Sequence, residues 1–333
     1  MTKLMQGKKV FVTGADGFIG SHLLEELVKE DAEVNGLVFY NSWNQIGWLN
    51  DLDQETLSKI NLVFGDVRDS DFISKYIKKA DYVFHLSSLI GIPYSYEAPL
   101  SYVSTNILGA TNVLQSCRKN KKLKKLIHVS TSEVYGSAQQ VPIKEDHPLV
   151  GQSPYSASKI AADKLAESFF LSFGTPLVIA RPFNTFGPRQ TSRAVIPTII
   201  SQIVSGSKEI QLGSLEPTRD FNYVTDTAKA MIELALSKDI DGEVVNIGSG
   251  TEWSIGQTLE IICDLMGKKV KVILDEERLR PEKSEVSRLL SDNSKLKKYT
   301  NWEQKISFKE GLRKTIRWIE KNIEKFDPNK YQK

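Results

Sequence analysis

The stretch Val10-Phe11-Val12-Thr13-Gly14-Ala15-Asp16-Gly17-Phe18-Ile19-Gly20 decides the fold of this chain. It begins as an apolar strand, passes through three glycines and opens a helix, because apolar residues recur on one helical face over 21–30. Glycines allow a tight turn and let backbone N–H groups approach a pyrophosphate at the helix N-terminus. Such a turn can be purely structural, but this one follows the first strand of the chain. We therefore predict a dinucleotide site formed by Gly14, Asp16, Gly17, Phe18, Ile19 and Gly20.

Strand-like apolar runs alternate with amphipathic segments outward from this stretch. The expected strands lie at 34–39, 62–64, 82–86, 126–130, 177–180 and 244–247, and the expected helices at 102–117, 155–173, 195–204, 255–266 and 308–324. This alternation predicts an α/β fold, a Rossmann-type doubly wound parallel sheet with a smaller C-terminal substrate-binding lobe. The sheet domain is expected over 1–182 with a return around 222–250, the lobe over 183–221 and 251–325, and a frayed tail over 326–333.

The composition excludes several classes of protein. Among 333 residues, 44 Lys and Arg balance 41 Asp and Glu, so a net charge of +3 gives no case for nucleic acid or an anionic membrane. No apolar run reaches the roughly 18 residues of a membrane span, and the N-terminus lacks a signal peptide's apolar core. The four histidines lack the spacing of metal ligands, so we expect no metal. Cys117 and Cys263 are far apart, which indicates free thiols and a cytoplasmic enzyme.

The stretch Tyr155-Ser156-Ala157-Ser158-Lys159 places a tyrosine and a lysine four residues apart on one face of a helix. A nearby ammonium, together with a cationic nicotinamide ring, favours the phenolate and lowers the tyrosine pKa. Tyr155 is therefore a candidate base near neutral pH, with Lys159 tuning it and holding the cofactor's ribose hydroxyls. Alone, a tyrosine and a lysine at this spacing often occur in helices by chance. In a chain that also has the glycine-rich turn, the same spacing favours a catalytic pair.

A third motif, Val129-Ser130-Thr131-Ser132-Glu133-Val134-Tyr135-Gly136, follows a strand. With the Gly-x-x-Gly-x-x-Gly spacing and the tyrosine–lysine pair, it resembles the extended branch of the short-chain dehydrogenase/reductase family. The resemblance implies that the Thr131 hydroxyl contacts the sugar oxygen that is oxidised. Epimerases of the family tend to have a small residue at position 133, and the Thr-Ser-Glu form resembles GDP-mannose 4,6-dehydratases. A carboxylate is apt because oxidation at C4 acidifies the C5 proton, which Glu133 could remove; the alternative is a solvated loop glutamate.

Further cofactor contacts are expected after the second and third strands. Asn41 and Ser42 stand where the ribose should lie, and because neither an acid nor an arginine is present there, the residues leave NAD and NADP open. Asp66, followed by Val67, matches the family position that contacts adenine. An Asp at such a place can also be a helix N-cap, and the two roles are compatible.

Arginines are expected to hold the substrate's diphosphate, because a planar guanidinium can grip phosphate oxygens bidentately. The segment 181–189 resembles the family's connection between sheet and substrate lobe, and the segments around 219 and 280 match places where family arginines meet the diphosphate. The predicted substrate-binding residues are Asn184, Arg189, Val195, Arg219 and Arg280.

The resemblance extends over about 9–321, and three segments, 89–96, 193–197 and 280–286, resemble the N-acetylglucosamine-nucleotide 4,6-dehydratases of the legionaminic acid pathway. It implies a 4,6-dehydratase that converts UDP- or GDP-N-acetylglucosamine to the 4-keto-6-deoxy sugar through a transient C4 oxidation, with NAD as cofactor. Hexose dehydratases with Thr-Asp-Glu differ at Ser132, which leaves open the group that protonates the leaving O6; Glu133 can do so with Ser132 assisting. The implied catalytic residues are Thr131, Ser132, Glu133, Tyr155 and Lys159.

Two other functions stay open. One is a nucleotide-sugar epimerase or UDP-glucuronate decarboxylase, and the other is a non-catalytic sensor that binds NAD(P) or a nucleotide sugar on the same fold. We also expect a homodimer through the helices at 102–117 and 155–173, because the second carries Phe169, Phe170, Leu171 and Phe173 in near succession.

Overall fold

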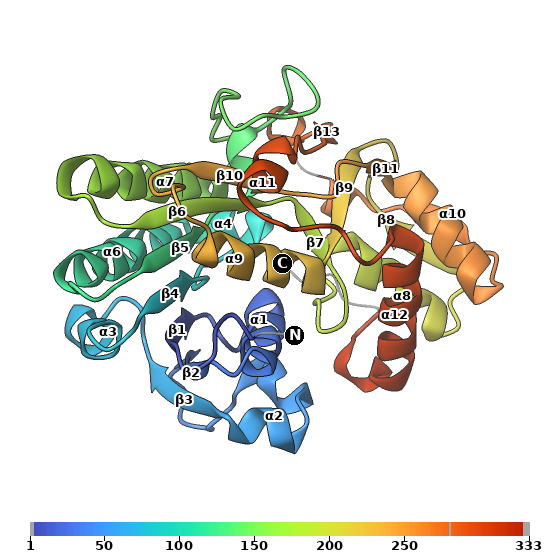
Figure 1. Cartoon of the computed structure of the whole chain (residues 1–333). Coiled ribbons are helices and arrows are strands. Elements are labelled where there is room, and N and C mark those ends of the chain that lie inside the picture. The colour runs from blue at the N-terminus through green and yellow to red at the C-terminus, as the bar shows by residue number, and fades with distance from the viewer. Residues whose placement is uncertain (1–2, 280, 329–333) are drawn as a thin grey trace.

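The computed structural model describes residues 3–279 and 281–328 of the chain. Its centre is a parallel seven-stranded sheet with the strand order β10-β6-β5-β4-β1-β2-β3 (Figure 1). The strands are β1 (Lys9–Thr13), β2 (Glu33–Phe39), β3 (Ile60–Gly65), β4 (Tyr82–His85), β5 (Lys125–Val129), β6 (Leu177–Pro182) and β10 (Val244–Ile247). The doubly wound parallel sheet that the sequence predicts is confirmed.

Both faces of this sheet are covered, because alternate side chains of each strand point to opposite sides. Val10 and Val12 of β1 pack into the core under one face, and Phe11 packs into the core under the other. Two groups of helices cover these faces (Figure 1). The first group is α1 (Phe18–Lys29), α9 (Val224–Leu236) and α11 (Ser294–Tyr299), and the second is α3 (Ser70–Ile77), α6 (Gly109–Lys119) and α7 (Pro154–Phe173).

The strand order reverses beside β1, which pairs with β2 on one side and β4 on the other. The connections that leave β1 and β4 therefore diverge and open a crevice at the carboxyl ends of the strands. In open parallel sheets, ligands bind at such a switch point. Several short elements lie in the connections between the central strands: η1 (Gly47–Asp51), α2 (Gln54–Ser58), α4 (Ile92–Glu97), α5 (Pro99–Tyr102), the π-helical η2 (Val103–Leu108) and η3 (Ser132–Tyr135).

A second lobe faces this crevice and has its own core. Its strands are β7 (Asn184–Phe186), β8 (Glu209–Leu212), β9 (Thr218–Tyr223), β11 (Glu252–Ser254), β12 (Lys271–Leu274) and β13 (Arg288–Leu289). Its helices are α8 (Val195–Val204), α10 (Ile255–Met266) and α12 (Phe308–Lys321), with the short η4 (Glu276–Arg278), η5 (Glu282–Ser284) and η6 (Ile323–Lys325). Aromatic rings link strands to helix: Phe308 stacks on Phe221 and Trp253, each with ring centroids 5.3 Å apart.

The structure departs from the sequence predictions in three places. The helix expected at 102–117 runs as α5, η2 and α6 over 99–119, with a π-helical segment in its middle. The helices α3 and α9 were not predicted at all. Of the tail expected to fray over 326–333, Phe326 is buried and packs its ring 6.0 Å from that of Trp318, and 329–333 lie outside the described residues.

Two kinds of feature are absent from the described ranges 3–279 and 281–328. None of the helices there combines the length and apolar character of a membrane span. No group of three or more His, Cys, Asp or Glu side chains in those ranges could hold a metal ion.

Candidate active site

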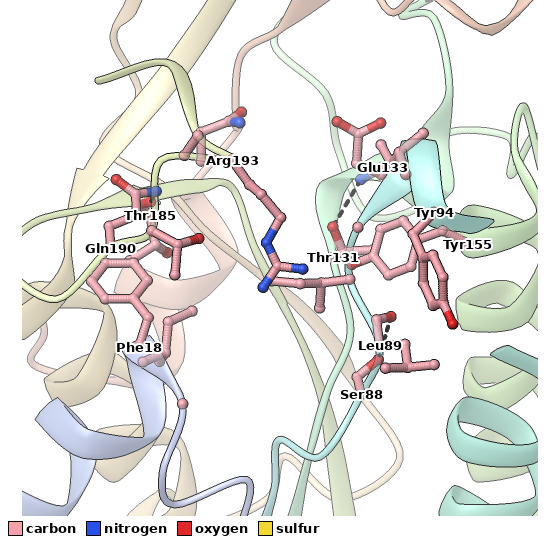
Figure 2. Close-up of a pocket in the computed structure, with 18 of the residues that line it drawn as sticks. Phe18, Ser88, Leu89, Tyr94, Thr131, Glu133, Tyr155, Thr185, Gln190 and Arg193 are labelled. Atoms are coloured by element: carbon pink, nitrogen blue, oxygen red, sulfur yellow. Dashed lines mark hydrogen bonds between the residues drawn. The ribbon is translucent and has the colours of Figure 1, made fainter. Parts of the chain in front are cut away.

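A cavity of about 1640 Å³ lies at the carboxyl ends of the central strands and is also lined by the second lobe. Most of the residues predicted from the sequence line it, and Figure 2 shows part of its wall. Those that line it are Gly14, Asp16, Gly17, Phe18, Ile19, Gly20, Asp66, Val67, Thr131, Ser132, Glu133, Tyr155, Lys159, Asn184, Val195 and Arg219.

The glycine-rich turn between β1 and α1 has the shape of a pyrophosphate cradle. Gly14 adopts a φ of +71°, and a Cβ on Gly20 would lie 2.0 Å from the Gly14 carbonyl oxygen, so a side chain at position 20 cannot fit. Gly17 caps α1 without a side-chain hydrogen bond, and the first turn holds no acidic residue. The positive end of the helix is thus offered to an anion, which fits a dinucleotide.

The two residues expected at the ribose lie elsewhere. Neither Asn41 nor Ser42 lines the cavity. The Asn41 side chain is engaged in its own turn, where its Oδ1 accepts hydrogen bonds from the backbone N–H groups of Trp43 and Gln45, at 3.2 and 2.9 Å. Its Nδ2 donates to the Gln45 carbonyl at 2.9 Å. The asparagine therefore shapes the loop after β2.

Asp66 does line the cavity, and its carboxylate is held by an arginine. Arg68 donates from Nε and Nη2 to Asp66 Oδ2, at 2.9 and 2.5 Å, and this hydrogen bonding lowers the Asp66 pKa. The helix that follows is capped by Asp69, whose Oδ1 accepts from the Phe72 N–H at 3.0 Å. Asp66 is therefore not the N-cap of α3 and remains at the adenine side of the predicted site.

The tyrosine–lysine pair sits at the start of α7, where a capping box of Ser153 and Ser156 with Pro154 at the first turn fixes the helix end. Tyr155 and Lys159 are buried, with 6% and 5% of their surfaces exposed. Lys159 Nζ donates to the Val129 carbonyl at 2.8 Å. The helix start thus presents both side chains to the cavity from a rigid element.

Burial acts on the charge states of both Tyr155 and Lys159. Burial raises the Tyr155 pKa; a hydrogen bond with Thr131 lowers it, but the Glu133 charge adds to the rise. Burial also lowers the Lys159 pKa to about 8, against the attraction of Asp163. In the protein alone, desolvation therefore favours the protonated tyrosine, and the phenolate expected from the sequence depends on the cationic nicotinamide ring as well as on Lys159.

Thr131 and Glu133 lie next to Tyr155 on the same wall (Figure 2). The Thr131 side chain caps η3, since its Oγ1 accepts from the Glu133 backbone N–H at 3.2 Å. This bond fixes the backbone that carries Glu133. Ser132, between them, is buried with 3% exposed. One short turn therefore brings a hydroxyl, a second hydroxyl and a carboxylate to one side of the cavity.

The predicted arginines separate into three cases. Arg219 lines the cavity, and its Nη2 lies 3.4 Å from Glu285 Oε1. Arg280 lies outside the described residues. Arg189 is not among the residues that line the cavity, and its guanidinium pairs with Glu25 of α1, beside the His22 ring. Arg189 therefore ties the connection between the lobes to the cofactor helix.

Two residues were not among the predicted site residues. Figure 2 shows the Arg193 side chain extending from the loop before α8 into the space between Thr131 and Gln190. Asn106 of η2 is buried; its Oδ1 accepts from Leu89 N at 2.8 Å, and its Nδ2 donates to Ser158 Oγ at 2.9 Å. Asn106 thereby joins the cavity loop after β4 to the helix that carries Tyr155. The signal for Asn106 that the sequence offers is an asparagine within an apolar helical stretch.

Comparisons with known proteins place this geometry among nucleotide-sugar enzymes. The family model described as GDP-mannose 4,6 dehydratase matches residues 11–315. A UDP-N-acetyl-alpha-D-glucosaminuronate decarboxylase of Bacillus cytotoxicus is 32% identical over 94% of this chain and 98% of its own, and the human dTDP-D-glucose 4,6-dehydratase is 32% identical over 95% and 91%. A crystal structure of a UDP-glucuronic acid 4-epimerase variant from Bacillus cereus, with a fluorinated UDP-glucuronic acid and NAD, has a TM-score of 0.85, with 29% identity over 94% of this chain and 99% of that one.

The Glu25–Arg189 pair predicts an acid-dependent part of the stability. Burial alone would raise the Glu25 pKa, but the hydrogen bond with His22 and the Arg189 charge together lower it to about 2, from an ordinary 4.5. A depressed carboxylate pKa contributes stability above pH 4.5 that is lost as the pH falls toward 2. Glu25→Gln should lose at most about 3 kcal/mol of unfolding free energy at pH 7.

Urea unfolding at pH 7, 4.5 and 3 measures this effect. The stability gap between wild type and Glu25→Gln should narrow as the pH falls. Glu55→Gln is the matched control, because Glu55 pairs with Lys59 on the exposed surface of the chain. A gap of constant size from pH 7 to pH 3 would contradict the assignment.

Proposed function

The chain belongs to the GDP-mannose 4,6 dehydratase family, extended short-chain dehydrogenases/reductases that modify nucleotide sugars, and from this premise we propose that it is a 4,6-dehydratase. Its proposed substrate is UDP- or GDP-N-acetylglucosamine, and its product is the 4-keto-6-deoxy sugar. The observation that carries the proposal is the Glu133 carboxylate on the wall that also holds Thr131 and Tyr155 (Figure 2). A base at C5 is what dehydration requires beyond C4 oxidation.

The proposed roles follow from the positions of these side chains. Tyr155, with Thr131 bonded to it, removes the proton of the sugar's O4, and Lys159 supplies a nearby positive charge when protonated. Glu133 removes the C5 proton, which the C4 ketone has made acidic. Glu133 then returns a proton to the leaving O6, with Ser132 assisting, so that water departs from C6. A proton must also return to C5 in the product, and the proton that Tyr155 took from O4 balances it. Each transfer uses a group from one short turn or from the first turns of α7.

NAD is the proposed cofactor, and when bound it supplies the hydride acceptor and donor for the sugar. The residues that would hold it are those of the turn 14–20, with Asp66 and Val67 at the adenine and Lys159 at the ribose. The choice of NAD is supported by the NAD bound to the Bacillus cereus relative. The diphosphate of the substrate would lie against Arg219, with Asn184 and Val195 beside it.

A second candidate function is favoured by Arg193. Its guanidinium extends into the cavity from the wall opposite Thr131 (Figure 2), where it could pair with a carboxylate on the sugar. This would suit a uronic acid sugar, and the Bacillus cytotoxicus and Bacillus cereus relatives are both named for such substrates. The chain would then be a decarboxylase or a 4-epimerase.

The cysteines support our expectation that the protein works in the cytoplasm. Cys117 and Cys263 are both free in the structure. Cys117 belongs to α6 and is buried in the core, and burial raises its thiol pKa. Inert free thiols of this kind are typical of proteins from reducing compartments.

The fate of the hydrogen at C4 tests the proposed reaction. We expect UDP- or GDP-N-acetylglucosamine deuterated at C4 to lose one water, seen by mass spectrometry, and to carry deuterium in the new C6 methyl group. Deuterium back at C4 with no mass change would indicate an epimerase instead. The same result with loss of CO₂ from a UDP-uronic acid would indicate the decarboxylase.

The proposed role of Glu133 predicts that a substitution of similar size, Glu133→Gln, causes a large loss of turnover. Glu133→Gln keeps the size of the side chain but removes the base, so turnover should fall by about 10²–10⁴, with NAD binding unchanged. The control is Glu167→Gln, because Glu167 pairs with Lys164 on the outer side of α7. Stopped-time assays measure turnover, and titration with NAD measures cofactor binding. Wild-type turnover in Glu133→Gln would refute the role.

We also propose that the chain forms a homodimer through α5, η2 and α7. Of the four apolar residues noted on α7, Phe169 is buried and Phe170 packs in the same core, but Leu171 is 74% exposed and Phe173 46%. Leu100, Val103 and Leu108 are exposed on α5 and η2. Exposed apolar side chains on neighbouring helices are typical of an interface.

Light scattering tests this assembly. We expect twice the chain mass of 37.5 kDa for the wild type and a monomer for the double variant Leu100→Glu/Leu108→Glu, because charges at the interface would be buried without partners. Leu274→Glu is the control, since Leu274 is 60% exposed on β12 of the other lobe. A wild-type monomer at all concentrations would contradict the proposal.

A further inference from the structure

A buried acidic residue lies one turn beyond the catalytic pair on α7. Tyr155, Lys159 and Asp163 follow at intervals of four residues, so they share one face of the helix. All three are buried, and only 2% of the Asp163 surface is exposed. Asp163 does not line the cavity, so it cannot touch a substrate or a cofactor there. It can act only through its neighbours.

Asp163 contacts two buried basic side chains and lies one helical turn from a third. Arg181 of β6 donates to its Oδ2 from Nε and approaches it with Nη2, at 3.1 and 3.0 Å, and His128 Nε2 lies 3.5 Å from its Oδ1. Lys159 is four residues earlier on the same face of α7, and the Asp163 charge raises the Lys159 pKa against the effect of burial. One carboxylate thus balances two buried positive charges, which would otherwise repel each other in a medium of low dielectric constant.

The other titratable groups around Lys159 do not supply negative charge close to it. His85 of β4 and His128 of β5 are buried, and burial lowers the pKa of each, so both are neutral near pH 7. The Thr13 hydroxyl accepts from Leu86 N and Ser87 N, so its proton goes to His85 Nδ1, at 2.8 Å. The groups that face this region are Tyr155 and Asp163 of α7, His85, His128, Arg181, and Glu133 and Tyr135 of η3.

Arg181 is also held from its far side, independently of Asp163. Its Nη1 donates to the Tyr135 hydroxyl at 3.0 Å, and that hydroxyl donates to Asn246 Oδ1 at 2.7 Å. The guanidinium also lies 4.9 Å from the centre of the Tyr135 ring. Arg181 therefore keeps partners, and its positive charge stays in place, when Asp163 loses its own charge.

We propose that Asp163 is a positioning residue that keeps Lys159 in its ammonium form and thereby sets the alkaline limit of turnover. The inference rests on the proposed function, because it takes Tyr155 and Lys159 as the catalytic pair. Above the alkaline limit the lysine is neutral and no longer favours the Tyr155 phenolate. The alternative is that Asp163 only anchors Arg181 in the core.

The test compares Asp163→Asn with wild type in two measurements. The first is the titration of Lys159 by NMR of lysine labelled with ¹³C at Cε, assigned with Lys159→Arg; it needs no substrate. The second is the pH profile of turnover of the NAD-loaded enzyme. Asp163→Asn should lower the Lys159 titration midpoint and the alkaline limb by about one pH unit or more, the usual effect of removing a neighbouring opposite charge.

Controls separate this role from a structural one. Asp163→Glu keeps the charge and should restore both midpoints. Asp226→Asn changes another buried carboxylate, which accepts from the backbone N–H groups of Lys305 and Ile306 far from the pair, and should leave both midpoints unchanged. An unchanged Lys159 midpoint in Asp163→Asn overturns the proposal, even where turnover falls at every pH.

The proposal can also be tested if Asp163→Asn does not fold or if the enzyme is inactive. If Asp163→Asn does not fold, Asp163→Asn/Arg181→Gln replaces the buried ion pair by a neutral pair, a change that proteins often tolerate. Because this variant also removes the Arg181 charge, its reference is Arg181→Gln: the Lys159 midpoint should be lower in the double variant than in Arg181→Gln, and equal midpoints overturn the proposal. If the enzyme proves inactive on UDP- and GDP-sugars, the proposed function fails, but the NMR titration still decides the role of Asp163.

Discussion

The contact between the ends of β1 and β4 is the constraint on which the rest of the site depends. The Thr13 hydroxyl accepts hydrogen bonds from Leu86 N and Ser87 N, both at 3.1 Å, and so locks the two strand ends together where the sheet changes direction. Immediately afterwards, a Cβ on Gly14 would lie 2.9 Å from Ser87 N, so only glycine allows the chain to turn there. The crevice for the dinucleotide opens between these two strand ends, and their contact positions both of its walls.

Hydrogen bonds make the wall that bears the candidate catalytic groups rigid. Asn106 bridges the loop after β4 to Ser158, and Ser158 Oγ donates to the Tyr155 carbonyl at 2.7 Å. The π-helical segment η2 carries Asn106 into the interior. Lys159 is tied to β5 through Val129. The first turns of α7 are thus connected to two central strands, which is the support that a precisely placed acid–base group needs.

Much of this was readable from the sequence, because the signals were local. The turn at 14–20 identified the fold through glycine spacing, and the motifs around Thr131 and Tyr155 place their side chains on the cavity as predicted. Arg189 could not be read in this way, since its partner Glu25 lies 164 positions earlier and its own φ is +67°. The turn that Asn41 builds with its own side chain could not be read either, because it depends on the backbone of the loop. The rise in the Tyr155 pKa was not foreseen, because the spacing of two residues reveals proximity but not burial.

The charges of the two walls bear on how such a cavity would distinguish its substrates. The reactions considered for this chain all begin with the proposed oxidation at C4, so the contacts of the substituent on C5 are what would distinguish their substrates. Here a carboxylate, Glu133, stands beside Thr131 and Tyr155, while the Arg193 guanidinium reaches in from the other side (Figure 2). A hydroxymethyl group can approach Glu133 without repulsion and can receive its proton. A sugar carboxylate would be repelled there and would have to turn toward Arg193, which moves C5 away from the base. The same two charges would therefore select both the sugar's orientation and the bond that breaks, and a neutral sugar is the one that brings C5 and O6 together to Glu133.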